Sequence, residues 1–376
     1  MSAAGGRPPS VPARATADVL VVGAGLVGLA SALAIADRGL RVLLVNDTRR
    51  GEASPAGAGM LAPSVEHAGP AAPAAADAFA VAARDRYPDY VASLRERTGV
   101  DVPLNRLGIL QLALEEGDGE RLRARAGGRS RWMTAADVAA LEPALSPAVV
   151  GALFHPDDGA VNNLVLMRAL KHAVGGHARV TVVGDAVLSV SLGADGGVEA
   201  VTRDERRLGA AQLVLATGAW ANLVEGLPRA LPVEPVRGQM MSVASKAVHH
   251  VVYGGRGYVV PRHDGRTLLG STMERVGFDA AFTEEGVADV RRIGASIAPA
   301  LANAPMLNAW AGLRPVTPDG LPILGRDPER PSLIYACGHS RNGILLAPLT
   351  GDCVADLAAG EAPRMELAPF RVERFG

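Results

Sequence analysis

Three glycines near the start of the chain have the spacing of a phosphate-binding turn. Gly23, Gly25 and Gly28 form a GxGxxG pattern directly after the apolar run Val19 to Val22, which is typical of a strand buried on both faces. Gly23 permits a tight turn, Gly25 lets the backbone approach a pyrophosphate, and Gly28 allows the next helix to pack closely on the strand. That helix would direct free N–H groups toward the phosphates. The pattern therefore predicts a dinucleotide site, whose turn also contains Ala24, Leu26 and Val27.

Arg314 is a candidate receptor for an anion. It lies between Leu313 and Pro315 in a strand-like run that also contains Trp310, an unusual setting for a solvated arginine. A planar guanidinium can bind a carboxylate through two hydrogen bonds and so orient a substrate. The alternative is an arginine whose stem packs along the surface.

Other common catalytic patterns are absent from the sequence. It contains no Ser-His-Asp pattern, HExxH motif, P-loop or obvious carboxylate pair, and Cys337 and Cys353 form no CxxC. The pair His249-His250 precedes an expected strand, in a loop where histidines are more often exposed than bound to a metal. We therefore expect no metal site, and the absence of these patterns agrees with a mechanism in which no side chain acts as a general acid or base.

A second strand is expected soon after the glycine turn. The first helix should end at Gly39, and residues 41–45 should form a parallel strand. Dinucleotide-binding folds usually place an acidic residue at the end of this strand, where it accepts hydrogen bonds from ribose hydroxyls. By spacing from Gly28, this position falls on Asn46, with Asp47 next to it. The ribose contact is therefore assigned to the two residues jointly.

Three local patterns follow in the middle of the chain. Residues 77–98 have the periodicity of one helix. A short helix is expected at 134–141, with Thr134 as its cap and Asp137 three residues further on. The segment 155–159, His-Pro-Asp-Asp-Gly, is typical of a solvated turn.

The remaining patterns indicate two kinds of sheet. Apolar strands at 180–190 and 212–217 should rejoin the first sheet, whereas alternating strands after Pro232 indicate an antiparallel sheet. We predict an α/β protein with a Rossmann-like nucleotide-binding domain and a second, mainly antiparallel, substrate domain. The expected division is a disordered leader at 1–17, a composite nucleotide-binding domain at 18–75, 150–228 and 320–376, and a substrate-binding domain at 76–149 and 229–319.

Composition narrows the classes of function. A chain of 376 residues can bury a large core and ordinarily forms two domains. A net charge of −1 provides no general attraction to nucleic acid or to an anionic membrane. Residues 1–17 contain no apolar segment of the kind that a secretion signal needs, and the two cysteines suit a reducing compartment. We expect a cytoplasmic protein without nucleic-acid or membrane partners.

Several sequence blocks occur in a specific order between about Asp18 and Gly360. They are VVGAGLVGL, GEASPAGAGML, ATGAWAN, EPVRGQMM, YVVPRHDGRTLLGSTME, WAGLRPVTPDGLPILG and CGHSRNGILLAPLTG. Together they resemble the D-amino-acid oxidase superfamily, most closely the bacterial glycine oxidases of the thiamine-biosynthesis type. The resemblance implies that the glycine turn binds FAD rather than NAD, and that the chain forms a homo-oligomer.

The resemblance also implies which residues contact FAD. Ala58, Gly59 and Met60 would lie beside the isoalloxazine, and Val187 would contact the adenine through its backbone. The start of the last helix would direct N–H donors toward the N1–C2=O side of the flavin, where negative charge develops on reduction. The residues of this segment are His339, Ser340, Arg341, Asn342, Gly343, Ile344 and Leu345, and further matching positions are Ala53, Ser54 and Gly218.

One position bears on how the flavin is held. Related sarcosine oxidases tether it through a cysteine just before the TPD turn, and the matching residue in this chain is Gly312. Non-covalent FAD is therefore predicted.

In the family, the position of Arg314 binds the substrate carboxylate. Tyr258 would hydrogen-bond the same carboxylate, and Arg341 matches an arginine near the substrate and the flavin. Met60 and Met273 would supply an apolar wall. For Tyr258 and both methionines, ordinary core packing is the alternative.

The favoured activity is oxidation of glycine or a similar small amino acid. A hydride would pass from the α-carbon to flavin N5, the imine would hydrolyse to the oxo acid (glyoxylate for glycine) and ammonia, and molecular oxygen would reoxidise the flavin and yield hydrogen peroxide. In bacteria the imine would serve thiazole synthesis for thiamine. The alternatives are an oxidase or dehydrogenase of a D-amino acid, sarcosine or a secondary amine, and a flavoprotein that acts on a macromolecule. Arg256, two residues before Tyr258, could project into the pocket and favour a small or acidic substrate.

Overall fold

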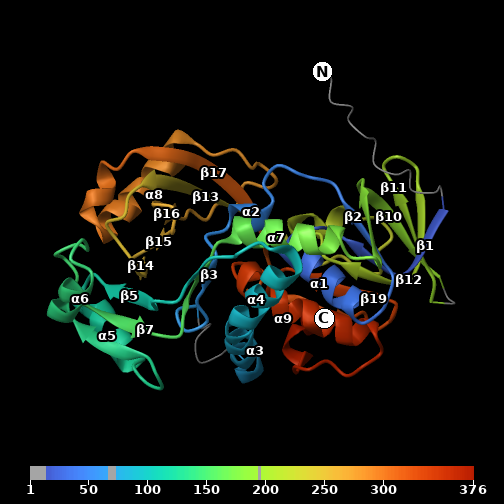
Figure 1. The fold of residues 1–376 in the computed structure, drawn as a ribbon, viewed down its shortest axis with the longest axis horizontal. Helices are drawn as coiled ribbons and strands as arrows, with labels where there is room; N and C mark the ends of the chain where they lie inside the picture. Colours follow the sequence, from blue (N-terminus) through green and yellow to red (C-terminus); the bar gives the residue numbers. More distant parts are fainter. Residues whose placement is uncertain (1–13, 67–72, 194–195) are drawn as a thin grey trace.

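The computed structural model describes residues 14–66, 73–193 and 196–376. These residues form two large sheets and a small three-stranded sheet, with helices between and around them (Figure 1). The helices are α1 (Leu26–Asp37), α2 (Ala53–Ala56), α3 (Ala74–Asp85), α4 (Tyr87–Thr98), α5 (Glu116–Ala124), α6 (Ala135–Leu141), α7 (Asn163–Gly175), α8 (Glu284–Ile297) and α9 (Gly343–Ala358), with short 3₁₀ helices η1 (Gly218–Leu223), η2 (Pro299–Ala302), η3 (Ala368–Phe370) and η4 (Val372–Phe375).

The first sheet carries the glycine turn. Its strand order is β10-β11-β12-β1-β2-β9, and β19 joins β12 while β18 joins β19. The strands are β1 (Arg14–Val22), β2 (Val42–Asn46), β9 (Val180–Gly184), β10 (Val187–Leu192), β11 (Val198–Thr202), β12 (Arg207–Leu215), β18 (Ile323–Arg326) and β19 (Leu333–Cys337). β1 pairs in parallel with β2 and β12, and β12 pairs in parallel with β19. The strands at 180–190 and 212–217 therefore rejoin the first sheet, as predicted.

The strand before the glycine turn is buried on both faces. Val19 and Val21 belong to a core cluster formed with α1, α7 and α9, whereas Leu20 and Val22 belong to a second cluster on the opposite face. This alternation explains why the run is apolar throughout instead of alternating with polar residues. On the helical face, Gly351 of α9 lies against α1, where a Cβ would stand 2.7 Å from the carbonyl carbon of Ala30.

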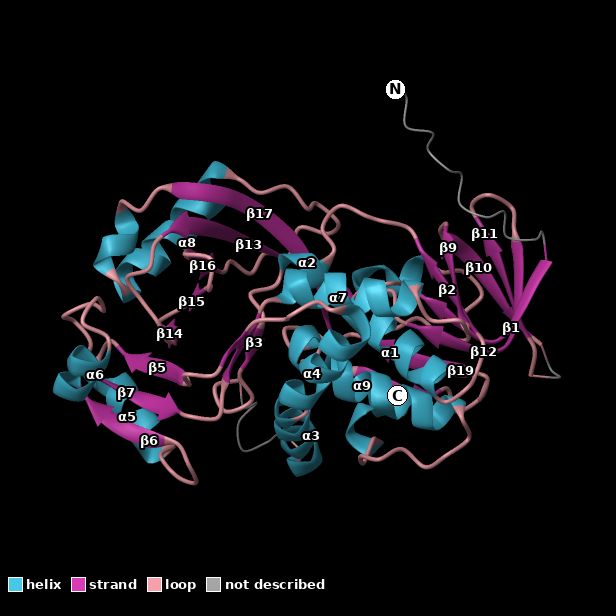
Figure 2. Cartoon of the chain, viewed as in Figure 1, coloured by secondary structure: helices cyan, strands magenta, loops and turns pink. Residues whose placement is uncertain are grey.

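The second sheet is mainly antiparallel and has the order β17-β13-β16-β15-β14-β5-β7-β6 (Figure 2). Its strands are β5 (Ile109–Ala113), β6 (Arg131–Thr134), β7 (Gly151–His155), β13 (Glu234–Ala244), β14 (Val251–Gly254), β15 (Gly257–Pro261), β16 (Arg266–Gly270) and β17 (Met306–Val316). A small sheet of β3 (Met60–Leu61), β8 (Gly159–Val161) and β4 (Leu104–Asn105) lies between the two large ones in the figure. The expected α/β fold with a second, mainly antiparallel sheet is confirmed.

The predicted domain boundaries stay a prediction, although two observations bear on them. Helices α3 and α4 contact α9 and α7, which cover the first sheet, and β7 at 151–155 lies in the second sheet. Of the expected disordered leader, residues 1–13 lie outside the described residues. The expectation is wrong for 14–17, which belong to β1 and pair with 207–210 of β12.

Two local predictions need correction. The helix expected at 77–98 is two helices that meet at Arg86, because Pro88 has no backbone N–H and its ring would clash with a carbonyl in a continuous helix. The turn at 155–159 is not solvated throughout, since the Asp158 side chain is buried. Its carboxylate accepts hydrogen bonds from Arg84 Nη1 and from the Ser64 hydroxyl, both at 3.0 Å.

The histidine pair is exposed at one position only. The side chain of His249 is 71 % exposed, whereas that of His250 is 12 % exposed and lies 2.6 Å from Oε1 of Glu142. Glu142 is fully buried and also accepts hydrogen bonds from the backbone N–H groups of both histidines. In the described part of the chain, no group of His, Cys, Asp or Glu side chains is arranged to hold a metal ion.

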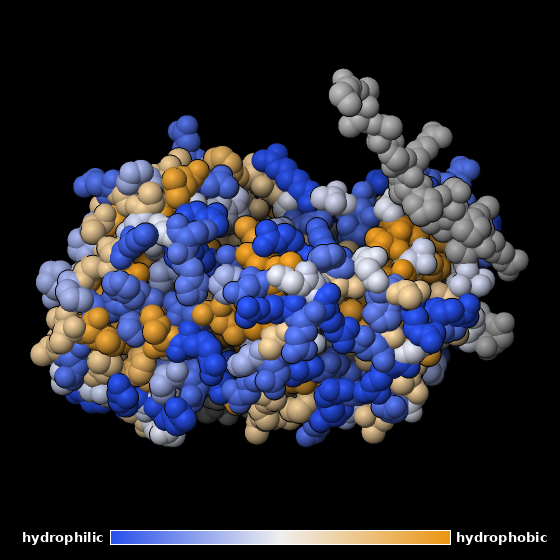
Figure 3. All heavy atoms as spheres, in the orientation of Figure 1, coloured by the Kyte–Doolittle hydropathy of each residue, from blue (hydrophilic) through white to orange (hydrophobic). Residues whose placement is uncertain are grey.

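No helix among the described residues is long and apolar enough to cross a membrane. On the face shown in Figure 3, hydrophobic residues form small clusters that are separated by hydrophilic ones.

Candidate active site

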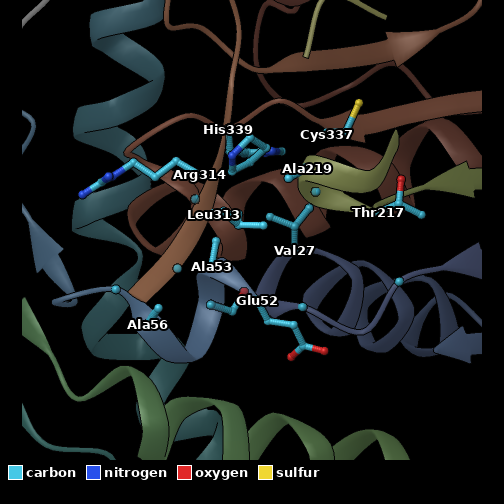
Figure 4. A pocket seen from close by; sticks show the side chains of 18 of the residues that line it. Val27, Glu52, Ala53, Ala56, Thr217, Ala219, Leu313, Arg314, Cys337 and His339 are labelled. Atoms are coloured by element: carbon cyan, nitrogen blue, oxygen red, sulfur yellow. The ribbon is translucent and has the colours of Figure 1, made fainter. Parts of the chain in front are cut away.

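A cavity lies between the two sheets and brings together most of the predicted site residues. It is lined by the glycine turn, the end of β2, α2, the start of β10, η1, and parts of β13, β15 and β17. Figure 4 shows Val27, Thr217, Arg314 and His339 around it, although they come from distant parts of the sequence. The predicted residues in its lining are Gly23, Ala24, Gly25, Val27, Asn46, Asp47, Ala53, Ser54, Ala58, Gly59, Met60, Val187, Gly218, Tyr258, Arg314, His339, Ser340, Arg341, Asn342, Gly343 and Ile344.

A few predicted residues do not line the cavity. Leu26, Gly28 and Leu345 are buried next to lining residues and belong to the surrounding structure. Met273 is 59 % exposed in the loop after β16 and is not among the residues that line the cavity, so the structure does not bring it to the apolar wall. Arg256 is also exposed and outside the lining.

The glycine turn has the close contacts that its sequence pattern predicts. Gly23 has φ +103°, and a Cβ there would stand 2.4 Å from the carbonyl oxygen of Ala216. A Cβ on Gly28 would stand 1.8 Å from the carbonyl oxygen of Gly23. Side chains at these two positions are therefore excluded by the backbone itself. The Ser54 hydroxyl accepts a hydrogen bond from the backbone N–H of Leu26 at 3.0 Å and so holds α2 against the start of α1.

Asn46 and Asp47 make different contacts. Asn46 Oδ1 accepts a hydrogen bond from the backbone N–H of Ala24 at 2.9 Å, which ties the end of β2 to the glycine turn. Asp47 Oδ2 accepts a hydrogen bond from Arg203 Nη1 at 3.1 Å, and this bond is the main reason that the pKa of Asp47 lies below its ordinary value. Asn46 thus shapes the turn, and Asp47 supplies the negative charge beside it.

At the other end of the cavity, Arg314 is held by neutral groups. Its Nη2 donates to the Ser271 hydroxyl at 2.7 Å and its Nη1 to the Thr272 carbonyl at 3.2 Å. Among the described residues Arg314 forms no ion pair, although it lines the cavity. Since its direct hydrogen-bond partners are uncharged and no described carboxylate forms an ion pair with it, this guanidinium is suited to bind an anionic group. Tyr258, 7 % exposed, lies in the same lining, and its hydroxyl donates to Met240 Sδ at 3.7 Å.

Glu66 is a lining residue that we did not predict. Its Oε1 accepts a hydrogen bond from Arg341 Nη2 at 2.8 Å, across 275 residues of sequence. Burial raises the pKa of Glu66, while the charges of Arg341 and Arg314 oppose that rise. The pairing leaves no local sequence signal, because Glu66 and Arg341 lie in separate segments that only the fold brings together.

The comparisons with known proteins agree with this geometry. Residues 18–357 match the model of the DAO family, described as FAD dependent oxidoreductase. The chain belongs to this family. It is 34 % identical over 371 residues to a glycine oxidase from Geobacillus kaustophilus, covering 95 % of this chain and 97 % of that protein. A crystal structure of glycine oxidase from the same organism superposes with a TM-score of 0.90 and 33 % identity, covering 95 % of this chain and 98 % of the other.

A second relative contains an additional part. The chain is 36 % identical to a bifunctional protein ThiO/ThiG from Synechocystis, covering 96 % of this chain and 54 % of that protein. The chain thus spans about half the length of that relative.

The residues present fit the cofactor of an FAD-dependent oxidoreductase. The glycine turn lines the cavity at the start of α1, where free backbone N–H groups favour a phosphate. The hydroxyl of Thr217, which lines the cavity, is buried and has no hydrogen-bond partner among the described residues. Because buried hydroxyls are nearly always hydrogen-bonded, this one indicates a polar ligand.

The predicted flavin-edge segment is held in an unusual conformation. Ser340 has φ +49°, which is rare for a residue with a side chain, and its backbone N–H donates to the Pro315 carbonyl at 2.9 Å. His339 is buried, and burial lowers the pKa of its imidazole to about 4. The imidazole is therefore neutral near pH 7, so positive potential in this segment comes from the start of α9 and from Arg341.

Gly312 lies where a side chain has no space. A Cβ at this position would stand 2.4 Å from Cβ of Ala56 in α2. A cysteine at this position would require α2 to move. This contact supports the prediction that FAD is held without a covalent bond at this position.

Proposed function

We propose that this FAD-dependent oxidoreductase oxidises the amine of glycine or of a similarly small amino acid. The observation that carries the proposal is the position of Arg314, a cation without an ion-pair partner among the described residues, in the cavity that also contains the glycine turn. An amino acid has one carboxylate for such a cation, and the names of the glycine oxidase relatives support this substrate class.

We call the end of the cavity around Arg314, Glu66 and Arg341 the substrate end. The residues at this end have separate roles in the proposal. Arg314 binds the carboxylate through its planar fork, and Tyr258 donates a hydrogen bond to the same group. Met60 and Met240, which also line the cavity, reduce the access of water to the α-carbon. Bound FAD supplies the acceptor for the hydride that leaves the α-carbon. No side chain is assigned as a general acid or base, since the neutral amine needs none.

The products and setting follow from the same chemistry. The imine of glycine hydrolyses to glyoxylate and ammonia, and molecular oxygen is the proposed final electron acceptor, with hydrogen peroxide as its product. We propose that the imine serves the synthesis of the thiazole of thiamine, which agrees with the ThiO/ThiG name of one relative. The proposed setting is a cytoplasmic homo-oligomer without nucleic-acid or membrane partners.

The test is spectroscopic and uses the purified chain with its flavin. Glycine, sarcosine and D-alanine are added separately without oxygen, and bleaching of the flavin bands is followed. Bleaching by glycine, with peroxide formed in air, is the expected result. Stronger bleaching by sarcosine or D-alanine would indicate a sibling oxidase, and bleaching without peroxide in air would indicate a dehydrogenase. Failure of all three amines would contradict the proposal.

A further inference from the structure

We propose that Glu66 sets the net charge of the substrate end to one positive unit, so that the site accepts substrates with one carboxylate and disfavours those with two. This inference deepens the proposed function and rests on it.

The first step is the arrangement of the charges. Glu66, Arg314 and Arg341 all line the cavity, and they come from the segment after β3, from β17 and from the segment before α9. Glu66 contacts Arg341 directly, with 2.8 Å between Oε1 and Nη2. The side chain of Glu66 is 12 % exposed and that of Arg341 is 36 % exposed. The pair is thus partly shielded from water, where charges interact more strongly than at the surface.

The second step is the charge count. Arg314 and Arg341 contribute two positive charges and Glu66 contributes one negative charge, so the described groups at this end sum to one positive charge. The other charged lining residues, Asp47, Arg49, Glu52 and Asp185, come from the β2–α2 segment and from the turn before β10. A single substrate carboxylate on Arg314 leaves this end neutral.

The third step concerns a second carboxylate. It would need Arg341 as its partner, but Arg341 is already bound to Glu66. The second carboxylate would then lie beside the carboxylate of Glu66, with no free cation to neutralise its charge. In a partly buried site this arrangement is unfavourable. Glu66 therefore excludes dicarboxylic substrates such as D-aspartate by repulsion, while small monocarboxylic amino acids meet a site of matching charge.

The backbone holds Glu66 in this position. Its backbone N–H donates to the Ala62 carbonyl at 3.0 Å, in the segment that follows the predicted flavin contacts at 58–60. Burial raises the pKa of Glu66, and the two neighbouring guanidinium groups favour its ionised form. Because Arg314 is one of these neighbours, the carboxylate acts on the substrate-binding cation as well as on Arg341.

The test measures binding of inert carboxylates without turnover. Acetate and malonate are titrated into the flavin-containing protein, and the dissociation constants are taken from the change in the flavin absorption. In Glu66→Gln, the affinity for malonate relative to acetate should rise about tenfold, which is the effect expected of one uncompensated charge at a partly buried site. Arg341→Gln should weaken acetate binding about tenfold, because this end then has no net charge.

The double variant Glu66→Gln/Arg341→Gln is the decisive comparison. It restores one net positive charge, so its ratio of malonate to acetate affinity should return to that of the natural protein. Glu66→Asp keeps the charge and should keep the ratio. Glu329→Gln is the matched control for loss of one negative charge, since its side chain is 73 % exposed and pairs with Arg229 far from the cavity.

Three results would overturn the inference. One is an equal change for acetate and malonate in Glu66→Gln, and another is a double variant that keeps the malonate preference. The third is a Glu66→Gln variant with an unchanged ratio but a lowered kcat and an altered pH profile, which would make Glu66 a proton acceptor. If the ratio shifts as expected while glycine, sarcosine and D-alanine are not oxidised, the proposed function fails and the charge selectivity stands.

Discussion

The guanidinium of Arg314 lies directly over the backbone of Gly238. A Cβ at Gly238 would stand 2.1 Å from Nη1 of Arg314 and 2.4 Å from Nη2 and Cζ. The two residues lie on the adjacent antiparallel strands β13 and β17, where Gly238 pairs with Gly312 and Arg314 pairs with Val236. The absence of a side chain at Gly238 gives the guanidinium its place in the cavity.

Replacement of this glycine should therefore displace the arginine. We expect Gly238→Ala to lower kcat/KM for glycine by about 100-fold, because a misplaced binding group no longer aligns the substrate. The flavin should remain bound. The measurement is steady-state peroxide formation together with flavin content. Gly117→Ala in α5 is the control, since a Cβ there meets no atom within 4 Å. Normal kinetics in Gly238→Ala would show that Arg314 can bind the carboxylate from another position.

Replacement of Arg314 by lysine should also lower kcat/KM. Arg314→Lys keeps the charge but loses the fork that donates to Ser271 and Thr272 and that is proposed to bind the substrate carboxylate. A fall in kcat/KM of about 10²-fold to 10³-fold is expected, mainly through KM. Arg256→Lys, at an exposed position outside the cavity, should leave the kinetics unchanged. Equal changes of kcat/KM in Arg314→Lys and Arg256→Lys would show that Arg314 does not bind the substrate.

The contact between Asn46 and the glycine turn predicts an effect on FAD affinity. Asn46→Ala removes the acceptor for the N–H of Ala24 and should weaken FAD binding about tenfold, near the net contribution of about 1 kcal/mol for a hydrogen bond. Asn46→Asp keeps the acceptor and should retain FAD better than the alanine variant. Fluorescence titration of the apoprotein with FAD measures both. Tighter FAD binding by Asn46→Ala than by Asn46→Asp would mean that repulsion between the new carboxylate and Asp47 outweighs the hydrogen bond to Ala24.

Gly312 provides a test of flavin attachment. Acid precipitation of the natural protein should release its flavin into the supernatant. Gly312→Cys should not become flavin-linked, because the new side chain meets Ala56, and overpacking should lower the free energy of unfolding by about 1–3 kcal/mol. Flavin that stays with the precipitate of the natural protein would contradict the prediction.

Two buried histidines predict how stability depends on pH. Burial lowers the pKa of both His155 and His339 to about 4, whereas an unfolded histidine has a value of about 6.5. As the pH falls below about 6.5, the unfolded chain takes up protons before the folded one does, so stability decreases and the loss is complete near pH 4. Each histidine should account for about 3 kcal/mol of this loss.

His155 is the better position for the pH test, because it lies outside the cavity and contacts Ser130 and Gln111. Denaturant unfolding from pH 7.5 to about 4 should show a smaller loss of stability in His155→Gln than in the natural protein. The exposed His172→Gln is the control. An unchanged slope in His155→Gln would mean that this imidazole is already protonated in the folded state.

The amino-acid sequence by itself determined the features whose causes are local. The glycine spacing at 23, 25 and 28 predicted the turn, since Gly23 and Gly28 are required by backbone atoms of the same strand-turn-helix unit or of the segment after its neighbour strand. A Cβ at Gly25 would instead meet the Ser54 hydroxyl oxygen at 3.1 Å. The cap of α6 was predicted as well, and Thr134 and Asp137 form the expected reciprocal hydrogen bonds within one helical turn. The order of several sequence blocks indicated the family by resemblance, and the family model confirmed it.

Only the tertiary structure decided the contacts between distant segments. The Glu66–Arg341 pair, the place of Arg314 over Gly238, and the burial of Asp158 depend on how strands and loops meet in space, which no short-range pattern encodes. The sequence placed Met273 in the apolar wall of the cavity, but in the structure this residue is exposed and outside the lining. Its position in a matching block does not give the direction of its side chain. Local backbone preferences act over a few residues, whereas the charge and shape of a site depend on side chains that the fold brings together from the whole chain.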